Sequence, residues 1–256
     1  MKIDVIQAPP GFFPGEVVHG FGTAGASGDV LGAGCRLPGM AHRPREDPFG
    51  VDENHRRFLE RLGVPDLRLY VPRQVHGDVL VEIDAHTPWR EPPAADALMT
   101  ERPGMMIGVL TADCVPILLA GPGIVAAVHA GWRGTVRGIV AGVIQTIREK
   151  KAIPPSELVG VIGPSIGPEC YPVGPEVADA LRERVGGSGP IGESCLVDGR
   201  LDLKKANLRL MLDAGMVPAR VHVIPLCVSC DPRFFSFRRD RGQTGRMLNA
   251  IGIRAS

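Results

Sequence analysis

The chain has 256 residues, 44% of them hydrophobic, which is enough apolar material for the core of one globular unit. Because 29 lysines and arginines nearly balance 28 aspartates and glutamates, the net charge gives no long-range attraction for nucleic acid or an anionic membrane. We therefore expect neither as a partner, no obligate protein partner is evident, and any anionic ligand must be bound by local arginines.

The N-terminal segment does not resemble a secretory signal, because no long apolar stretch follows its basic residue. The most apolar stretch, residues 105–120, is interrupted by Asp113 and Pro116, which indicates buried strands rather than a membrane span. Six cysteines are scattered through the chain, and without an export signal we expect reduced thiols and a cytoplasmic location.

Glycine and proline, with 33 and 24 residues, occur throughout the chain and predict many turns and few long helices. The first short apolar runs are residues 3–6 and 17–21. A helix is then predicted over residues 52–62, with Asp52 as its N-cap and Gly63 as its C-terminal stop. Strand-like runs follow at residues 67–71, 79–83, 97–100, 105–110, 115–119 and 124–128.

The Gly-Pro-Gly segment at 121–123 predicts a tight reversal between the last two of these strands. After a glycine-rich loop at 131–134, apolar side chains recur at helical spacing from Val136 to Ile147. Residues 158–162 are a further predicted strand, residues 202–214 a helix that ends at Gly215, and residues 221–224 a last strand. Because the strands follow one another directly, we expect a single α/β domain over residues 1–256 with largely antiparallel sheets, not a doubly wound nucleotide fold.

Three residues that commonly bind metals, His76, Cys114 and His129, each lie at the end of an apolar run. The predicted hairpin brings Cys114 and His129 to the same end of a sheet, and His76 lies between two strands, from where it can reach that edge. Two imidazoles and one thiolate suit zinc and leave a fourth position for water or substrate, so we predict a catalytic metal site.

Each of these residues alone is more often part of the core, and only their joint occurrence in three polar loops favours a site. Asp113, beside Cys114, has two interpretations that stay open at this point. It orients a ligand or moves a proton, or it is an ordinary turn residue after a strand.

Six segments combine these residues with glycine, arginine and aromatic side chains. They are QVHG (74–77), ADALMT (95–100), LTADCVP (110–116), HAGWRG (129–134), IGPSIGPECY (162–171) and FFSFRRD (234–240). In this order they resemble the bacterial laccase-domain family, which is named multicopper polyphenol oxidase or peptidoglycan-editing factor and is understood as zinc-dependent purine nucleoside phosphorylase. The resemblance extends from about Phe21 to Arg246.

The resemblance implies phosphorolysis of adenosine, inosine and methylthioadenosine to free base and ribose 1-phosphate, with adenosine deamination as an additional activity. It implies a layered α/β/β/α sandwich and a Zn²⁺ site at His76, Cys114 and His129, which with Asp113 are the candidate catalytic residues. A divalent ion there would also activate water against C6 of adenine, with Asp113 handling the proton.

The chain departs from the family pattern at three places. Ala24 follows Phe-Gly-Thr where the family commonly has arginine, residues 30–39 do not reproduce a family segment, and Val228 follows Cys227 where threonine is common.

Candidate substrate contacts lie in the same segments. Arg133, Arg238 and Arg239 are candidates for phosphate, because a guanidinium binds an anion with two parallel hydrogen bonds, although each can also be a solvated surface residue. Gln74 is a further candidate for substrate binding. Backbone N–H groups of residues 163–167 offer a weaker phosphate site, and the phenylalanines of FFSFRRD can stack on a purine or face the core.

Three other functions remain as alternatives. A copper-dependent polyphenol oxidase shares the two-histidine, one-cysteine set, but seven histidines without a His-x-His pair argue against several copper ions. A cysteine hydrolase or deamidase would use Cys114 and His129 without metal. Because such a pair needs no third ligand, a requirement for His76 would argue against this function. A non-enzymatic zinc module would use Cys227 and Cys230, which need ligands from distant residues because the chain has no second Cys-x-x-Cys pair.

Overall fold

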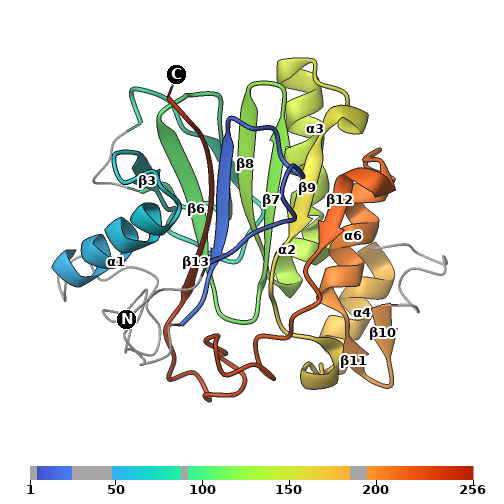
Figure 1. Cartoon of the computed structure of the whole chain (residues 1–256). Coiled ribbons are helices and arrows are strands. Elements are labelled where there is room, and N and C mark those ends of the chain that lie inside the picture. The colour runs from blue at the N-terminus through green and yellow to red at the C-terminus, as the bar shows by residue number, and fades with distance from the viewer. Residues whose placement is uncertain (1–4, 25–47, 88–91, 185–194, 256) are drawn as a thin grey trace.

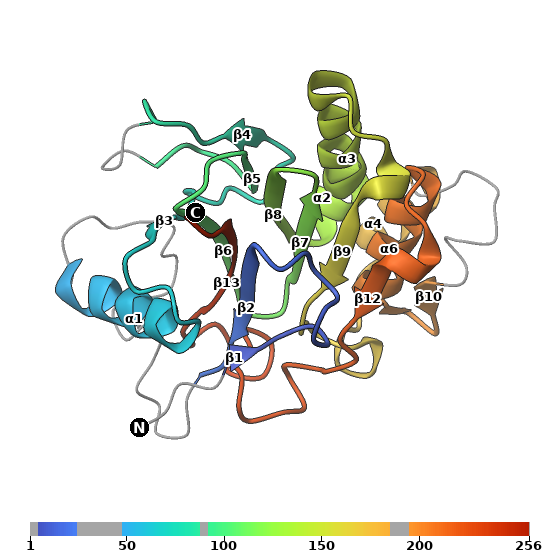
Figure 2. The same ribbon diagram turned by 45° about the horizontal axis from the view of Figure 1, so that its top comes forward.

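A computed structural model of the chain describes residues 5–24, 48–87, 92–184 and 195–255. Two β-sheets lie face to face, and helices cover the outer face of each sheet (Figures 1 and 2). These layers are the predicted α/β/β/α sandwich. Within the described residues, no helix is long and apolar enough to cross a membrane.

The first sheet has five strands in the order β1-β2-β13-β6-β3. The strands are β1 (Val5–Ile6), β2 (Val17–Gly22), β13 (Met247–Ile253), β6 (Met105–Thr111) and β3 (Arg68–Tyr70). All neighbours in this sheet are antiparallel except β3 and β6, which are parallel.

The second sheet has six strands in the order β12-β9-β7-β8-β5-β4. The strands are β12 (Val221–Val223), β9 (Val159–Ile162), β7 (Val115–Gly121), β8 (Ile124–Ala130), β5 (Ala97–Thr100) and β4 (Leu80–Glu82). Only the pairs β12–β9 and β4–β5 are parallel, so the predicted antiparallel character is confirmed. A separate small ribbon joins β10 (Leu196–Val197) and β11 (Arg200–Leu201).

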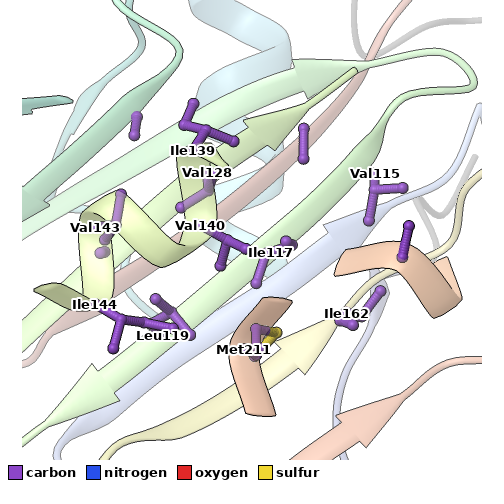
Figure 3. Packing of buried hydrophobic residues seen from close by; sticks show 14 of the residues in the cluster. Val115, Ile117, Leu119, Val128, Ile139, Val140, Val143, Ile144, Ile162 and Met211 are labelled. Atoms are coloured by element: carbon purple, nitrogen blue, oxygen red, sulfur yellow. The ribbon is translucent and has the colours of Figure 1, made fainter. Parts of the chain in front are cut away.

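Alternation along β7 divides the core into two layers. Val115, Ile117 and Leu119 belong to the cluster that packs against helices, whereas Leu118 belongs to the cluster between the two sheets. Successive side chains of a strand point to opposite faces, so a strand between two apolar layers is hydrophobic at every position. Figure 3 shows Ile117 and Leu119 next to Val140, Val143 and Ile144 of the covering helix α3 (Ile139–Lys151).

Helices on the two outer faces complete the sandwich. The second sheet is covered by α2 (Trp132–Arg137), α3, α4 (Pro175–Arg184) and α6 (Leu203–Asp213). The first sheet is covered by α1 (Pro48–Arg61), whose Phe58 packs in one cluster with Met106 and Leu248. Three short 3-10 helices lie in connections, at η1 (Pro155–Glu157), η2 (Pro168–Cys170) and η3 (Pro218–Arg220).

The predicted strands agree with the observed ones to within two residues, but three helical predictions need correction. Helix α1 begins at Pro48 and not after Asp52, and proline is well suited to the first position of a helix. Residues 131–134 are not a loop, because α2 begins at Trp132. The single helix expected from Val136 onward is interrupted at Gly138, whose φ of 77° ends α2 and lets α3 begin in a new direction.

Candidate metal centre

The hairpin of β7 and β8 positions two of the three predicted metal ligands. Cys114 immediately precedes β7, and His129 lies near the end of β8, where it pairs with Pro116. His129 is 2% exposed and Cys114 is half-buried. His76 is an exposed residue of the loop between β3 and β4, and its φ of 57° is unusual for a side chain of this size.

The three side chains converge although they come from separate segments of the chain. One ligand atom from each of His76, Cys114 and His129 lies within 4.8 Å of the other two. The two imidazole rings are nearly perpendicular, with 4.8 Å between their centroids. Ligand atoms around a tetrahedral zinc ion lie about 3.4–3.6 Å apart, so a small closing movement suffices.

Gly131 keeps the side of this cluster clear. A Cβ added to Gly131 would lie 3.2 Å from Cys114 Sγ and 3.4 Å from His76 Cδ2, in the space that an ion and its further ligand need. The donor set and this space together fit a borderline-soft divalent ion with three protein ligands.

Asp96 orients two of the three ligands, although it was not among the predicted site residues. Its buried carboxylate accepts hydrogen bonds from the backbone N–H groups of Val75, His76 and Gly77, at 3.2, 3.0 and 2.7 Å. Its Oδ1 also lies 2.8 Å from His129 Nδ1. With Asp96 ionised, Nδ1 carries the proton, and Nε2 of His129 is left to bind an ion.

The groups of the cluster stabilise one another's charged forms. Burial acts to raise the pKa of Asp96, but hydrogen bonds with His129 and the Gly77 N–H hold it below its ordinary value. Burial also acts to raise the pKa of Cys114, but the charge of His129 and hydrogen bonds with His129 and His76 lower it to about 6. Burial acts to lower the pKa of His129, whereas the Cys114 thiolate and Asp96 raise it to about 9. The cluster therefore favours the thiolate of Cys114, which is the form that binds metal.

Asp113 links the cluster to the FFSFRRD segment. Its carboxylate accepts hydrogen bonds from the Ser236 hydroxyl and the Arg238 backbone N–H, both at 2.7 Å. Its backbone carbonyl accepts from the N–H of Ile166, and its φ of 94° is strained for a residue with a side chain. Burial raises the pKa of Asp113, although both hydrogen bonds act against this.

Two of the predicted arginines approach the cluster. The exposed guanidinium groups of Arg133 and Arg238 lie over Trp132 and Tyr171, at 4.3 and 5.1 Å from the ring centroids. Burial and the charge of Cys114 raise the pKa of Tyr171 to about 12, while the charges of Arg238 and Arg133 act to lower it. Arg238 also donates to the Pro172 carbonyl at 3.1 Å, which holds its guanidinium beside Tyr171. Tyr171 was not predicted as a site residue, although it ends the IGPSIGPECY motif.

The other predicted phosphate ligand, Arg239, is used within its own loop. All five of its N–H donors have acceptors, namely both carboxylate oxygens of Asp240 and the carbonyls of Val228, Asp231 and Phe234. No donor of Arg239 is left for phosphate, so the structure does not bring it together with Arg133 and Arg238.

Gln74 is also committed to the protein. Its amide donates to the Leu110 carbonyl at 2.8 Å and accepts from the Leu110 N–H at 2.7 Å, which fastens the loop before His76 to β6. In residues 163–167, the four backbone N–H groups that exist are likewise taken, by Pro116, Leu226, Asp113 and Cys227. Neither segment presents these donors to a ligand.

Among the phenylalanines of FFSFRRD, only Phe237 has a half-exposed ring. Phe237 is 50% exposed, whereas Phe234 is 1% exposed and belongs to a small core cluster. Phe237 is therefore the one of these two that can stack on a ligand. The divergent segment after Ala24, including residues 30–39, lies outside the described residues.

Comparison with known proteins identifies close similarity over most of the chain. The family model described as "Multi-copper polyphenol oxidoreductase laccase" matches residues 39–254. The purine nucleoside phosphorylase YlmD of Geobacillus stearothermophilus is 38% identical over 221 residues, covering 82% of this chain and 81% of the relative. A purine nucleoside phosphorylase of Deinococcus radiodurans is 38% identical over 213 residues, covering 81% of this chain and 79% of the relative.

The fold has solved counterparts as well. The crystal structure of YlmD from Geobacillus stearothermophilus has a TM-score of 0.85 and 34% identity, covering 98% of this chain and 96% of that one.

Proposed function

The chain belongs to the family described as multi-copper polyphenol oxidoreductase laccase. Because its relatives in the comparison are named purine nucleoside phosphorylase, we propose that this chain has that activity. Its substrates would be a purine nucleoside and inorganic phosphate, and its products free base and ribose 1-phosphate. The names of the relatives support this reaction. The observation that carries it in this chain is the convergence of His76, Cys114 and His129 within 4.8 Å.

We propose Zn²⁺ as the resident metal, held by His76, Cys114 and His129. When bound, such an ion supplies Lewis acid chemistry that polarises a substrate atom. The chain's own residues prepare the site: Asp96 fixes the tautomer of His129, and Gly131 leaves the space beside the ligands clear.

Phosphate would be bound by Arg133 and Arg238. In phosphorolysis an oxygen of phosphate bonds to C1′ of the ribose, while the bond from C1′ to the purine nitrogen breaks and the base leaves with the electron pair. A guanidinium suits the anion because it is always charged and offers two parallel donors. Asp113 would act as a positioning residue, since it accepts hydrogen bonds from the Ser236 hydroxyl and the Arg238 backbone N–H.

A direct assay tests this reaction. Zinc-loaded protein is incubated with inosine or adenosine, with and without phosphate, and the products are separated by chromatography. We expect base and ribose 1-phosphate in equal amounts, and only with phosphate. Lack of both products in the presence of zinc and phosphate would refute the proposed activity.

Adenosine deamination is a second proposed reaction of the same site. The burial that raises the pKa of Asp113, next to Cys114, favours a carboxyl group that can exchange a proton. Formation of inosine from adenosine without phosphate would establish this activity, and unchanged adenosine in that sample would exclude it.

A cysteine hydrolase is favoured by one specific observation. The lowered pKa of Cys114 and the raised pKa of His129, with Asp96 behind the histidine, are also the properties of a nucleophilic thiolate pair. His76 distinguishes the two mechanisms, because only a metal enzyme needs it as a ligand. We expect the His76→Ala protein to lose the zinc of this cluster and, with it, turnover. Full zinc content and a full rate in this variant would favour the Cys114–His129 pair.

A polyphenol oxidase has less support. The cluster offers two imidazoles and one thiolate, which is enough for a single ion, whereas oxidases of the laccase type use several copper ions with many more imidazoles.

A further inference from the structure

A second group of ligand-type side chains lies outside the centre described above. Glu169 and Cys170 belong to η2, and Cys227 and Cys230 belong to the turn that follows β12. One ligand atom from each of the four lies within 4.8 Å of all the others. The fold thus brings to Cys227 and Cys230 the distant ligands that the sequence alone did not provide.

The distances in this group suit a tetrahedral ion. Cys170 Sγ lies 3.2 Å from Cys230 Sγ, across 60 positions of the chain, and Cys230 Sγ lies 3.5 Å from Glu169 Oε1. Two thiolates on one zinc ion are about 3.8 Å apart, because each Zn–S bond is about 2.3 Å long. The observed distances, from 3.2 Å to at most 4.8 Å, lie on both sides of that value.

The surrounding backbone supports charged ligands. The N–H of Gly167 donates to Cys227 Sγ at 3.1 Å, and such a bond stabilises a thiolate. A Cβ added to Gly167 would overlap the Glu169 carboxylate, so a side chain at this position would displace that carboxylate from its present place.

A partly buried cation, Lys204, lies next to the group. The ammonium group of Lys204 donates to the carbonyls of Ser165 and Leu226, at 3.2 and 3.1 Å. Three thiolates and one carboxylate carry more negative charge than a divalent ion neutralises, and Lys204 offsets part of the excess. Burial lowers the pKa of Lys204, and the charges of Asp202, Cys227 and Glu169 act against this.

We propose that Cys170, Cys227 and Cys230, together with the carboxylate of Glu169, bind a structural zinc ion separate from the first centre. Four protein ligands leave no open position, which is characteristic of structural zinc sites. The ion would join the loop after β9, which carries Tyr171, to the loop after β12, which carries Arg238. The proposal concerns metal binding alone and holds whichever reaction the first centre performs.

Counting bound zinc tests the proposal independently of activity. The full-length protein is kept reduced, loaded with Zn²⁺, freed of unbound ion by gel filtration and analysed by mass spectrometry for metal per chain. We expect two equivalents in the wild type, and loss of one in Cys230→Ala. Cys195→Ala is the matched control, because this buried cysteine belongs to neither group, and it should keep both.

The same experiment tests zinc binding at each of the two sites separately. His76→Ala should lose one equivalent if the first centre binds zinc, and it should retain the zinc held by the cysteines. A Cys230→Ala protein that holds as much zinc as the wild type would overturn the proposal, whatever His76→Ala shows.

A second measurement needs no variant and so does not depend on a variant folding. Wild-type protein is alkylated with and without Zn²⁺, and modified cysteines are mapped by mass spectrometry. We expect zinc to protect Cys170, Cys227 and Cys230 together. Equal modification of all three with and without zinc, or a Cys170–Cys230 disulfide in the zinc-loaded protein, would contradict the proposed site.

Discussion

At the scale of single residues, the carboxylate of Asp96 connects both histidines of the metal centre. It accepts hydrogen bonds from the backbone N–H groups of His76 and of the residues before and after it, and it also hydrogen-bonds Nδ1 of His129. A ligand binds a metal ion well only when its ring is correctly oriented. Loss of a hydrogen-bond partner that fixes this orientation commonly weakens metal affinity by about 10-fold to 100-fold. Asp96 therefore matters to the site although it does not touch the ion.

We predict that Asp96→Asn weakens zinc binding by roughly 10-fold to 100-fold and lowers turnover with it. The amide cannot accept hydrogen bonds from three N–H groups and His129 as a carboxylate does. Competition with a chromophoric chelator measures the affinity. Asp78→Asn is the control, since Asp78 is exposed and lies 3.9 Å from Arg137 at the surface. Equal zinc affinity in both variants would show that Asp96 does not orient the ligands.

The residues of the candidate site were predictable to different degrees. His76, Cys114 and His129 were predicted because their chemistry and their places at strand ends are visible in the sequence. Asp96 was missed because an aspartate before a buried strand looks like an ordinary turn residue. Gln74 and Arg239 were predicted as substrate ligands, but their hydrogen bonds stay within the protein, and no local pattern distinguishes the two cases.

A buried histidine away from the site determines part of the pH dependence of stability. His19 Nε2 accepts the N–H of Ala8 at 2.9 Å, and burial lowers the pKa of His19 to about 4, from about 6.5 in an unfolded chain. Between these pH values the unfolded chain binds a proton that the folded chain does not. The stability that depends on a neutral His19 is therefore fully present above pH 6.5 and is lost as the pH falls towards 4.

We predict that proton uptake by His19 in the unfolded chain lowers the free energy of unfolding by about 2 kcal/mol at pH 5. Urea denaturation at pH 8 and at pH 5 measures the change. In His19→Gln, whose amide oxygen can still accept the Ala8 N–H, the loss should be smaller by about that amount, while the exposed His86→Gln should behave as the wild type. An unaltered pH dependence in His19→Gln would exclude this origin.

At the scale of elements, the break between α2 and α3 depends on Gly138. Its φ is 77°, and its N–H donates to carbonyls at the end of α2. The break turns the chain so that Ile139 and Val143 of α3 pack onto the second sheet. Apolar spacing predicted the helix, but it could not predict the break, because glycine within a helical pattern is compatible with both outcomes.

We predict opposite effects from alanine at two glycines one turn apart. Gly138→Ala should lower the free energy of unfolding by about 1–2 kcal/mol, because a Cβ is disfavoured at this positive φ. Gly142→Ala should raise it by about 0.5–1 kcal/mol, since Gly142 is exposed within α3 and a Cβ there meets no atom within 4 Å. Urea denaturation measures both. The same sign for both variants would contradict the assigned break.

Most strands were predicted from the sequence, but β13 and the two short strands β10 and β11 were not. Both faces of β13 are covered, because Ile251 packs between the sheets and Leu248 packs against α1, so the alternation that marks a half-exposed strand is absent. It also contains Asn249 and Gly252, which are uncommon in strands. Asn249 is accommodated because its amide donates to Thr111 Oγ1 and to the Val109 carbonyl. A strand of this kind is recognised only from its neighbours.

At the scale of the whole molecule, the sandwich makes the candidate centre possible. The loop between β3 and β4, the turn before β7 and the end of β8 meet because two sheets of mixed strand order are packed together. The layers were expected from the family resemblance, whereas local patterns predicted the strands without their order. Pairings such as β13 with β6 depend on contacts between residues more than a hundred positions apart, which periodicity does not contain.

The proposed centre requires that two ring nitrogens and one sulfur, from the loop after β3, the end of β8 and the turn before β7, hold one zinc ion. Anomalous diffraction at the zinc edge, from a crystal of zinc-loaded and active protein, tests it directly. We predict a peak at bonding distance, about 2.0–2.3 Å, from a ring nitrogen of His76, a ring nitrogen of His129 and Sγ of Cys114. An active crystal without anomalous density among these three atoms would contradict the account.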